Sequence, residues 1–249
     1  MSELATIRVN PPHAALTLNR ADARNALSIE LLRAMHARID ELAARPDVHV
    51  VTVTGAGKAF CAGMDLKQVL GTPGAPLQLL MLLADFCLKL RALPAVTIAA
   101  VNGAAVGGGC GLATVCDLAI THADSKMGFP EVDMGVCPAV VAPWLARKVG
   151  AGRARAILLR GGLMSGGDAE RLGIVNSCVA SREELDSAAH SLAESLASGG
   201  PRALAATKSL LNEIDGSLDA AQAHRAAELS ATILATPEAQ TTLRARLGV

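Results

Sequence analysis

The chain has 249 residues, of which 51% are hydrophobic and 18% charged, and its formal net charge at pH 7 is zero. This composition predicts a folded chain with a substantial core and argues against disorder. Without a basic surplus, nucleic acid is not expected as the main partner. Aromatic residues make up only 2% of the chain, which removes most stacking platforms for bases.

Two further features concern location and metal binding. No charge-free apolar run reaches 18 residues, so no transmembrane helix is predicted. The start, Met1-Ser2-Glu3-Leu4, lacks a basic segment followed by an apolar one, so no signal peptide is expected. The cysteines form no C-x-x-C pair, and no two histidines have metal-ligand spacing. We therefore expect buried thiols, no metal, no membrane association and a cytoplasmic location.

The first half of the chain is predicted to alternate strands and helices. Residues 5–10 and 15–19 flank Pro11-Pro12-His13 and predict a hairpin. A helix is expected from Asn25, because apolar residues then recur at helical spacing as far as Leu42. The next expected elements are a buried strand over 48–54, a helix over 77–93, a buried strand over 96–101, a short helix over 108–115 and a strand over 117–121.

The second half is predicted to be mainly helical. Short helices are expected over 142–150, 153–160 and 166–173, and the chain is Ala-rich and helical from Glu183 onward. We predict an α/β core over residues 1–198 that contains the ligand site, and a helical C-terminal region over 199–249. Because so short a region buries little by itself, it is expected to pack on the core or on a neighbouring subunit.

Two glycine-rich turns are the first sign of chemistry. Buried strands end at Gly55 and Gly103, and the open turns Ala62-Gly63-Met64 and Gly107-Gly108-Gly109 follow them. Free N–H groups at a helix start attract negative charge, so the two turns could surround one anionic group. The alternative is a pair of tight strand-to-helix turns with close packing. The second turn is not a dinucleotide-binding motif, because its third glycine would fall on Leu112.

Two carboxylates near these turns allow more than one interpretation. Asp65 is most simply a helix N-cap, which leaves the Met64 N–H at the helix start without an intrahelical acceptor. Glu131 follows Pro130 in an apolar stretch. It either complements a helix dipole in a first turn, or lies in an apolar pocket where a raised pKa makes it a general base.

Four sequence blocks resemble those of the enoyl-CoA hydratase/isomerase (crotonase) superfamily in order and spacing. They are residues 18–27 (LNRADARNAL), 60–66 (FCAGMDL), 100–110 (AVNGAAVGGGC) and 129–135 (FPEVDMG). A weaker match covers residues 169–175, AERLGIV. The resemblance covers essentially the whole chain and implies an α/β fold, a spiral of β-β-α units with a C-terminal helical trimerisation region. A homotrimer or a dimer of trimers is therefore expected.

The resemblance also implies site residues. It assigns an oxyanion hole to the N–H groups of Met64 and Gly108 and a catalytic role to Glu131. The substrate is then an acyl-CoA thioester, with no separate cofactor. Residues implied in binding the substrate and its CoA moiety are Arg24, Ala62, Gly63, Asp65, Lys67, Gly107 and Gly111. Preorganised donors of this kind stabilise a developing oxyanion by roughly 3–4 kcal/mol each.

One position departs from the family pattern. Typical hydratases of this family carry a second glutamate where this chain has Gly111. Residues 138–143, PAVVAP, resemble a bacterial branch named as methylglutaconyl-type enoyl-CoA hydratases, which also has glycine there. This resemblance favours hydration of 2-enoyl-CoA to 3-hydroxyacyl-CoA. Asp133 is a possible second carboxylate, because alternation along an extended segment would place it on the same side as Glu131; otherwise it lies in a surface turn.

Three other functions remain open from the sequence. A lone glutamate can move a proton between two carbons, as single-glutamate enoyl-CoA isomerases do. Decarboxylation of a malonyl-type thioester needs the oxyanion hole but no paired base. A non-catalytic CoA-binding paralogue would bind thioesters without turning them over.

Overall fold

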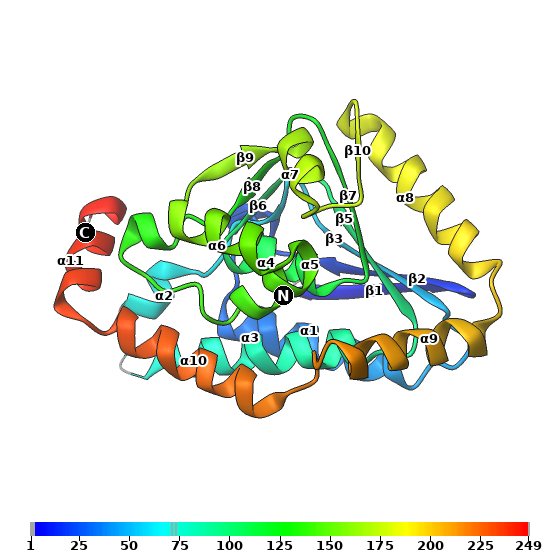
Figure 1. Cartoon of the computed structure of the whole chain (residues 1–249), viewed down its shortest axis with the longest axis horizontal. Helices are drawn as coiled ribbons and strands as arrows, with labels where there is room; N and C mark the ends of the chain where they lie inside the picture. The colour runs from blue at the N-terminus through cyan, green and yellow to red at the C-terminus, as the bar shows by residue number, and fades with distance from the viewer. Residues whose placement is uncertain (1–2, 71, 73, 249) are drawn as a thin grey trace.

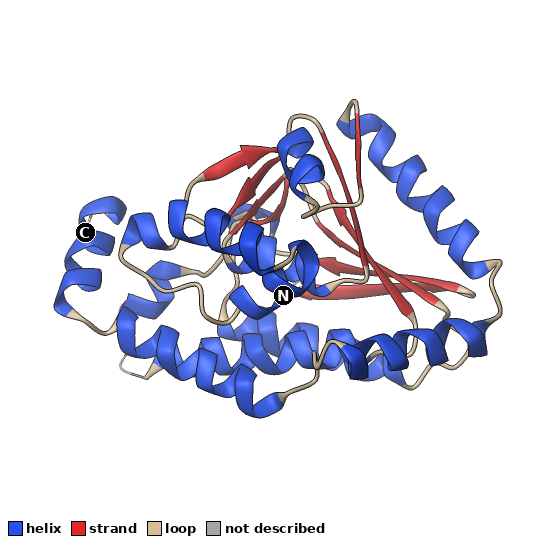
Figure 2. Cartoon of the chain, viewed as in Figure 1, coloured by secondary structure: helices blue, strands red, loops and turns tan. Residues whose placement is uncertain are grey.

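The computed structural model describes residues 3–70, 72 and 74–248. The predicted α/β architecture is confirmed: two β-sheets lie among helices, as Figures 1 and 2 show. The strands are β1 (Ala5–Asn10), β2 (His13–Leu18), β3 (Val50–Gly55), β4 (Ala59–Cys61), β5 (Val96–Val101), β6 (Ala104–Val106), β7 (Leu118–His122), β8 (Lys126–Gly128), β9 (Leu163–Ser165) and β10 (Ser177–Val179).

The helices alternate with strands as far as β10, and the elements after β10 are all helical. They are α1 (Ile29–Ala43), α2 (Leu66–Leu70), α3 (Ala75–Ala92), α4 (Gly108–Val115), α5 (Ala142–Val149), α6 (Ala151–Arg160), α7 (Gly166–Leu172), α8 (Arg182–Ala197), α9 (Pro201–Ile214), α10 (Ala220–Leu234) and α11 (Pro237–Leu247), with short 3-10 helices η1 (Ala21–Ala23) and η2 (Val132–Met134). No helix among the described residues has both the length and the hydropathy needed to cross a bilayer.

The two sheets are built by successive pairs of strands. The six-stranded sheet has the order β1-β2-β3-β5-β7-β10, and the four-stranded sheet has the order β4-β6-β8-β9. Each of the pairs β3/β4, β5/β6 and β7/β8 therefore sends its first strand to the large sheet and its second to the small one. Among the described strands, only β1–β2 and β8–β9 pair antiparallel. This winding is the spiral of β-β units that was predicted.

A buried amide ties neighbouring turns of the spiral together. The Asn102 Nδ2 donates to the carbonyl oxygens of Gly55, at 2.7 Å, and Gly57, at 3.1 Å. Its Oδ1 accepts from the Gly55 N–H at 3.2 Å. A Cβ atom on Gly103 would lie 2.1 Å from the Lys58 carbonyl oxygen, so only glycine allows these two segments of the backbone to approach so closely. The strand ends that precede the glycine-rich turns are thereby fixed relative to each other.

The predicted start of the first helix is wrong by one turn. Helix α1 begins at Ile29, with the Ser28 hydroxyl accepting from the Leu31 N–H at 3.1 Å as an N-cap. Asn25 has a left-handed backbone (φ 56°), and its amide donates to the carbonyls of Ala56 and Ala59. The side chain therefore serves a tertiary contact, which a helical pattern in the sequence does not reveal.

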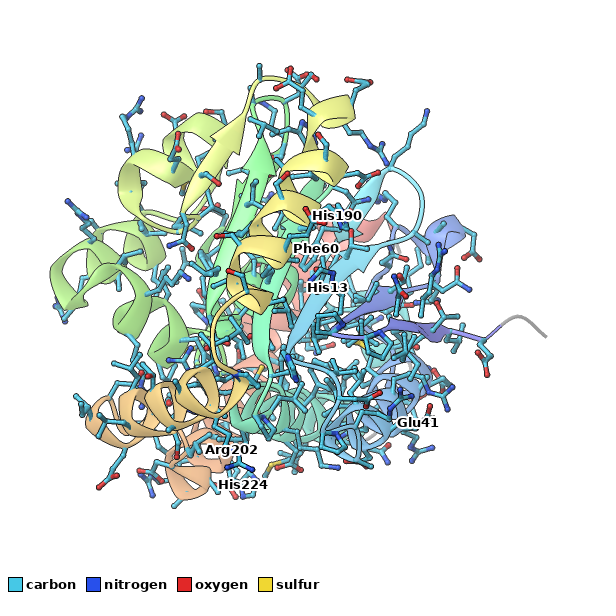
Figure 3. The ribbon with its side chains drawn as sticks, turned by 90° about the vertical axis from the view of Figure 1, so that its right-hand side faces the viewer. His13, Glu41, Phe60, His190, Arg202 and His224 are labelled. Carbon is cyan, nitrogen blue, oxygen red and sulfur yellow. The ribbon has the colours of Figure 1, made fainter. Side chains whose placement is uncertain are left out.

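The C-terminal helices pack on the core of their own chain. Helix α8 lies across one face of the six-stranded sheet (Figure 3), with Leu185 and Ala189 in a buried cluster with β-strand residues such as Ile98. Helix α10 lies along α3 (Figure 1), joined to it by a 2.7 Å contact between His224 Nε2 and Asp85 Oδ1. The division of the chain at residue 198 stays a prediction.

Helix α9 is anchored by a buried cation. Lys208, 6% exposed, pairs with Asp117 at 2.8 Å and donates to the Ala95 carbonyl at 2.9 Å. Burial lowers the pKa of Lys208, and the neighbouring Asp117 opposes that shift. Asp117 also pairs with Arg91 at 3.3 Å. These contacts join the C-terminal region to the start of β7 in the large sheet.

Replacing this lysine should weaken the fold. We expect Lys208→Met to lower the free energy of unfolding by about 2–3 kcal/mol, somewhat less than the usual loss on breaking a buried pair, because Arg91 still faces Asp117. Urea denaturation measures the change. Arg202→Met, at an exposed position of the same helix, is the control and should change stability by less than about 0.5 kcal/mol. Equal stability of the two variants would contradict the anchoring role.

Candidate active site

Six of the eleven predicted site residues meet at one cavity. Its volume is about 160 Å³, and it lies where the turns after β4 and β6 meet α3 and the segment that follows β8. The predicted residues that line it are Ala62, Gly63, Met64, Gly107, Gly108 and Glu131. Most of the remaining lining is aliphatic, from residues such as Leu80, Leu83 and Val140.

The first glycine-rich turn is held beside the segment that precedes α1. The Leu27 N–H donates to the Gly63 carbonyl at 2.8 Å, and the Asp65 N–H donates to the Leu27 carbonyl at 2.9 Å. Met64 lies between these two bonds, and its N–H has no backbone acceptor among the described residues. A Cβ atom on Gly63 (φ 89°) would lie 2.8 Å from the Val106 carbonyl oxygen, so the second turn packs directly against the first.

The second turn presents its own free donor. Gly108 is the first residue of α4, so its N–H has no intrahelical acceptor. Gly107 has φ 53°, and its N–H donates to the Gly128 carbonyl at 2.8 Å. Both Gly108 and Met64 line the cavity. This placement agrees with the predicted oxyanion hole, whose function stays a prediction.

Glu131 lies against the second turn. A Cβ atom on Gly107 would be 2.7 Å from Glu131 Oε1, so any other residue there would displace the carboxyl. Glu131 Oε2 is buried and has no hydrogen-bond partner among the described residues. Burial raises the pKa of Glu131 from 4.5 to about 7, opposed only by a backbone hydrogen bond. The carboxyl can therefore gain or lose a proton near neutral pH.

Asp133 does not join Glu131. The segment is not extended, because Glu131 itself is helical (φ −57°, ψ −43°) and Val132–Met134 form η2. This turn directs the exposed Asp133 carboxylate to the Gly162 N–H, which donates to it at 2.8 Å, and Asp133 does not line the cavity. The alternative that placed Asp133 on the same side as Glu131 is wrong, and the surface-turn alternative describes this residue.

Gly111 does not border the cavity either. A Cβ atom on Gly111 would lie 2.1 Å from Val141 Cγ1 and 2.7 Å from Val141 Cβ. Val141 lines the cavity, whereas Gly111 is buried behind it. The expected contact of Gly111 with substrate is therefore not found. The valine side chain occupies the space into which a longer side chain at position 111 would extend.

The predicted cations Arg24 and Lys67 do not line the cavity, although their neighbours Ala62 and Leu66 do. The Arg24 carbonyl accepts from the Ala62 N–H at 3.0 Å, and the side chains of Arg24 and Lys67 are exposed. Asp65 instead forms a 2.7 Å ion pair with Arg20, and it also accepts a long hydrogen bond from the Gln68 N–H as a helix cap. The Asp65 carboxylate thus has a structural role, and Arg24 and Lys67 remain the predicted partners of phosphate groups.

Part of the cavity lining was not predicted from the sequence. Leu80 and Leu83 come from α3, and Ser230 comes from α10. The leucines follow the same periodic pattern as any core helix, so nothing distinguished them. A signal for Ser230 was present, because Ala227, Ser230 and Leu234 recur at helical spacing on the buried face of α10.

Comparisons with known proteins point to one family. The model of the family described as "Enoyl-CoA hydratase/isomerase" matches residues 13–245. A Thermus thermophilus protein named "Putative enoyl-CoA hydratase" is 38% identical over 216 residues, which are 84% of this chain and 85% of that protein. The crystal structure of an enoyl-CoA hydratase from Mycobacterium avium is similar with a TM-score of 0.88 and 29% identity, over 100% of this chain and 97% of that chain. That of an enoyl-CoA hydratase/isomerase from Xanthobacter autotrophicus has a TM-score of 0.87, with the same identity and coverage.

The desolvated carboxyl should make stability depend on pH. Because the Glu131 pKa is raised in the folded chain, the wild type should lose stability as pH rises from about 4.5 to about 7, relative to Glu131→Gln. The difference should reach up to about 3 kcal/mol and stay constant above that range. Urea denaturation at several pH values measures it. Glu213→Gln, at an exposed site, is the control. A difference independent of pH would contradict the desolvation of Glu131.

Proposed function

Because the chain belongs to the enoyl-CoA hydratase/isomerase family, we propose that it hydrates 2-enoyl-CoA thioesters to 3-hydroxyacyl-CoA. The observation that carries this proposal is the buried Glu131 carboxyl, one oxygen of which has no partner among the described residues, beside two turns with free N–H groups. The name of the Thermus relative supports hydration as the reaction.

The two free N–H groups act on the thioester. Its carbonyl oxygen accepts from Met64 and Gly108, and it gains negative charge when the enolate forms. Donors that are already in place stabilise this charge without reorganisation. Arg24 and Lys67 bind the phosphates of the CoA arm, and the binding energy of this arm holds the reacting carbons in position.

Glu131 then carries the protons. In hydration, the Glu131 carboxylate accepts a proton from the water whose oxygen bonds to C3, and the resulting carboxyl then gives that proton to C2 of the enolate. The net addition is one water, and Glu131 is again a carboxylate at the end. The reverse reaction starts from the same carboxylate, which removes the C2 proton. A pKa of about 7 makes both forms accessible near neutral pH, as general acid–base catalysis requires.

One observation favours isomerisation as the second candidate. Val141 fills the space over Gly111, so Glu131 is the one carboxylate that lines the cavity within the described part of the chain. A single carboxylate suffices to take a proton from C2 of a 3-enoyl-CoA and return a proton to C4. Malonyl-type decarboxylation is less favoured, because the substrate carboxylate would lie near Glu131 without a cation in the described lining.

The cavity also limits the acyl group. Its volume of about 160 Å³ is close to that of an engineered apolar cavity of roughly 150 Å³ that holds benzene. Acyl groups of about four to six carbons therefore fit best. Among the described residues, no Lys, Arg or His side chain lines it, so a terminal carboxylate would be buried without a counter-ion. The resemblance to methylglutaconyl-type enzymes is not expected to extend to their charged substrate.

Product analysis tests the reaction. Crotonyl-CoA should gain the mass of one water and lose its enoyl ultraviolet absorbance, whereas 3-hexenoyl-CoA would shift its double bond at unchanged mass if isomerisation occurs. Glu131→Gln should lower kcat by about 10²–10⁴-fold, with thioester affinity nearly retained. Asp133→Asn is the control and should stay active, because that carboxylate bonds Gly162 outside the cavity. Full activity of Glu131→Gln would refute the role of Glu131, and binding without turnover would indicate a non-catalytic paralogue.

We also propose that the chain assembles as a homotrimer or a dimer of trimers. Helix α9 exposes Leu210 (55%), Leu211 (53%) and Ile214 (72%) in the single chain, and such apolar patches are typical of subunit interfaces. Light scattering at micromolar concentration should give a trimeric or hexameric mass for the wild type. Leu211→Asp combined with Ile214→Asp should give monomers of native helicity. A monomeric wild type would contradict the assembly.

A further inference from the structure

We propose that Ser230 is a positioning residue, through which helix α10 of the C-terminal region fixes the position of the cavity wall that follows Glu131. The inference rests on the proposed function for its kinetic readout. The wall consists of residues 136–141, of which Val136, Cys137, Pro138, Val140 and Val141 line the cavity. Ser230 lines the same cavity and is hydrogen-bonded to this wall, although it lies about ninety residues further along the chain.

The Ser230 hydroxyl makes two hydrogen bonds to this wall. It donates to the Cys137 carbonyl at 2.8 Å and accepts from the Ala139 N–H at 3.2 Å. Ser230 is only 2% exposed, so water does not readily replace it. Neither backbone group has another backbone partner among the described residues. One hydroxyl therefore satisfies a buried donor and a buried acceptor, each of which is costly to leave unpaired.

The wall needs hydrogen bonds from Ser230 because it has little regular secondary structure of its own. Residues 136–138 belong to no helix or strand, and the turn over 139–141 leads into α5. At its other end the wall is bonded to the catalytic segment, since the Val136 N–H donates to the Glu131 carbonyl at 2.9 Å. A shift of Cys137 or Ala139 is thus transmitted over a few residues to the backbone of Glu131.

The helix that carries Ser230 is itself fixed. Ala227 and Leu234 are fully buried on the same face of α10, and the contact between His224 and Asp85 joins this helix to α3. Helix α3 also supplies Leu80 and Leu83 to the cavity. Ser230 consequently links the wall to the same rigid helix pair that forms the aliphatic side of the cavity.

Removal of the hydroxyl should loosen the wall and admit water to Glu131. A more hydrated carboxyl has a lower pKa, because desolvation is the cause of its raised value. This consequence separates positioning from a merely structural role. A structural residue would change the melting temperature without changing the titration of Glu131.

The test compares Ser230→Ala with the wild type in the dehydration of 3-hydroxybutanoyl-CoA, which needs the Glu131 carboxylate. We expect kcat/KM to fall on the order of 10- to 100-fold, the usual effect of small misplacement in an active site. The acidic limb of its pH profile should move to lower pH. Thr232→Ala is the matched control, since that exposed hydroxyl on the same helix bonds only the Glu228 carbonyl at 2.8 Å; it should leave both quantities unchanged.

A second readout does not depend on turnover. The titration of Glu131 can be followed by the carbon NMR signal of its labelled carboxyl, and Ser230→Ala should lower the midpoint even if the proposed reaction is wrong. An unchanged midpoint with an unchanged pH profile would overturn the positioning role. If Ser230→Ala does not fold, Ser230→Cys, which keeps the side chain's shape and weakens its hydrogen bonds, is read by the same two measurements.

Discussion

The rest of the site depends on one constraint, the burial of the Glu131 carboxyl beside a glycine-rich turn. Its Oε2 atom has no hydrogen-bond partner among the described residues. Leaving a buried carboxyl oxygen unpaired costs free energy. The fold tolerates this cost because the surrounding aliphatic core is large and because the carboxyl can take up a proton. The same feature that lowers stability at neutral pH moves the pKa of Glu131 into the range that proton transfer requires.

The glycine-rich turns satisfy a complementary requirement, which is to bring backbone donors close to that carboxyl. Gly63 lies against the Val106 carbonyl, and Gly107 lies against Glu131 itself, at distances that exclude a Cβ atom. Both turns follow strands of the small sheet, β4 and β6, which pair in parallel. Parallel strands end at the same edge of a sheet, so the donors of Met64 and Gly108 converge as a consequence of topology.

Features set by local sequence could be predicted, whereas those set by contacts distant in sequence could not. The strand over Val96–Val101 and the helix over Gly108–Val115 agree with their predicted bounds, because apolar runs and glycines act within a few residues. Of the two alternatives for Asp133, the shared side with Glu131 is not found, since one helical turn at η2 replaces an extended segment. The cover of Gly111 by Val141 joins residues thirty positions apart, and no periodicity in the sequence reports such a contact.

The C-terminal region, although its composition sets it apart from the core, takes part in the cavity as well as in the proposed assembly. Its outward face, on α9, exposes large aliphatic side chains that suit assembly. Its inward face, on α10, contributes Ser230 to the cavity and packs along α3. Because α10 follows α9 after the short connection 215–219, a change at the proposed subunit contacts of α9 can reach the cavity wall through α10. The proposed assembly and the proposed catalysis are therefore connected through neighbouring helices, even though the residues that carry them are separate.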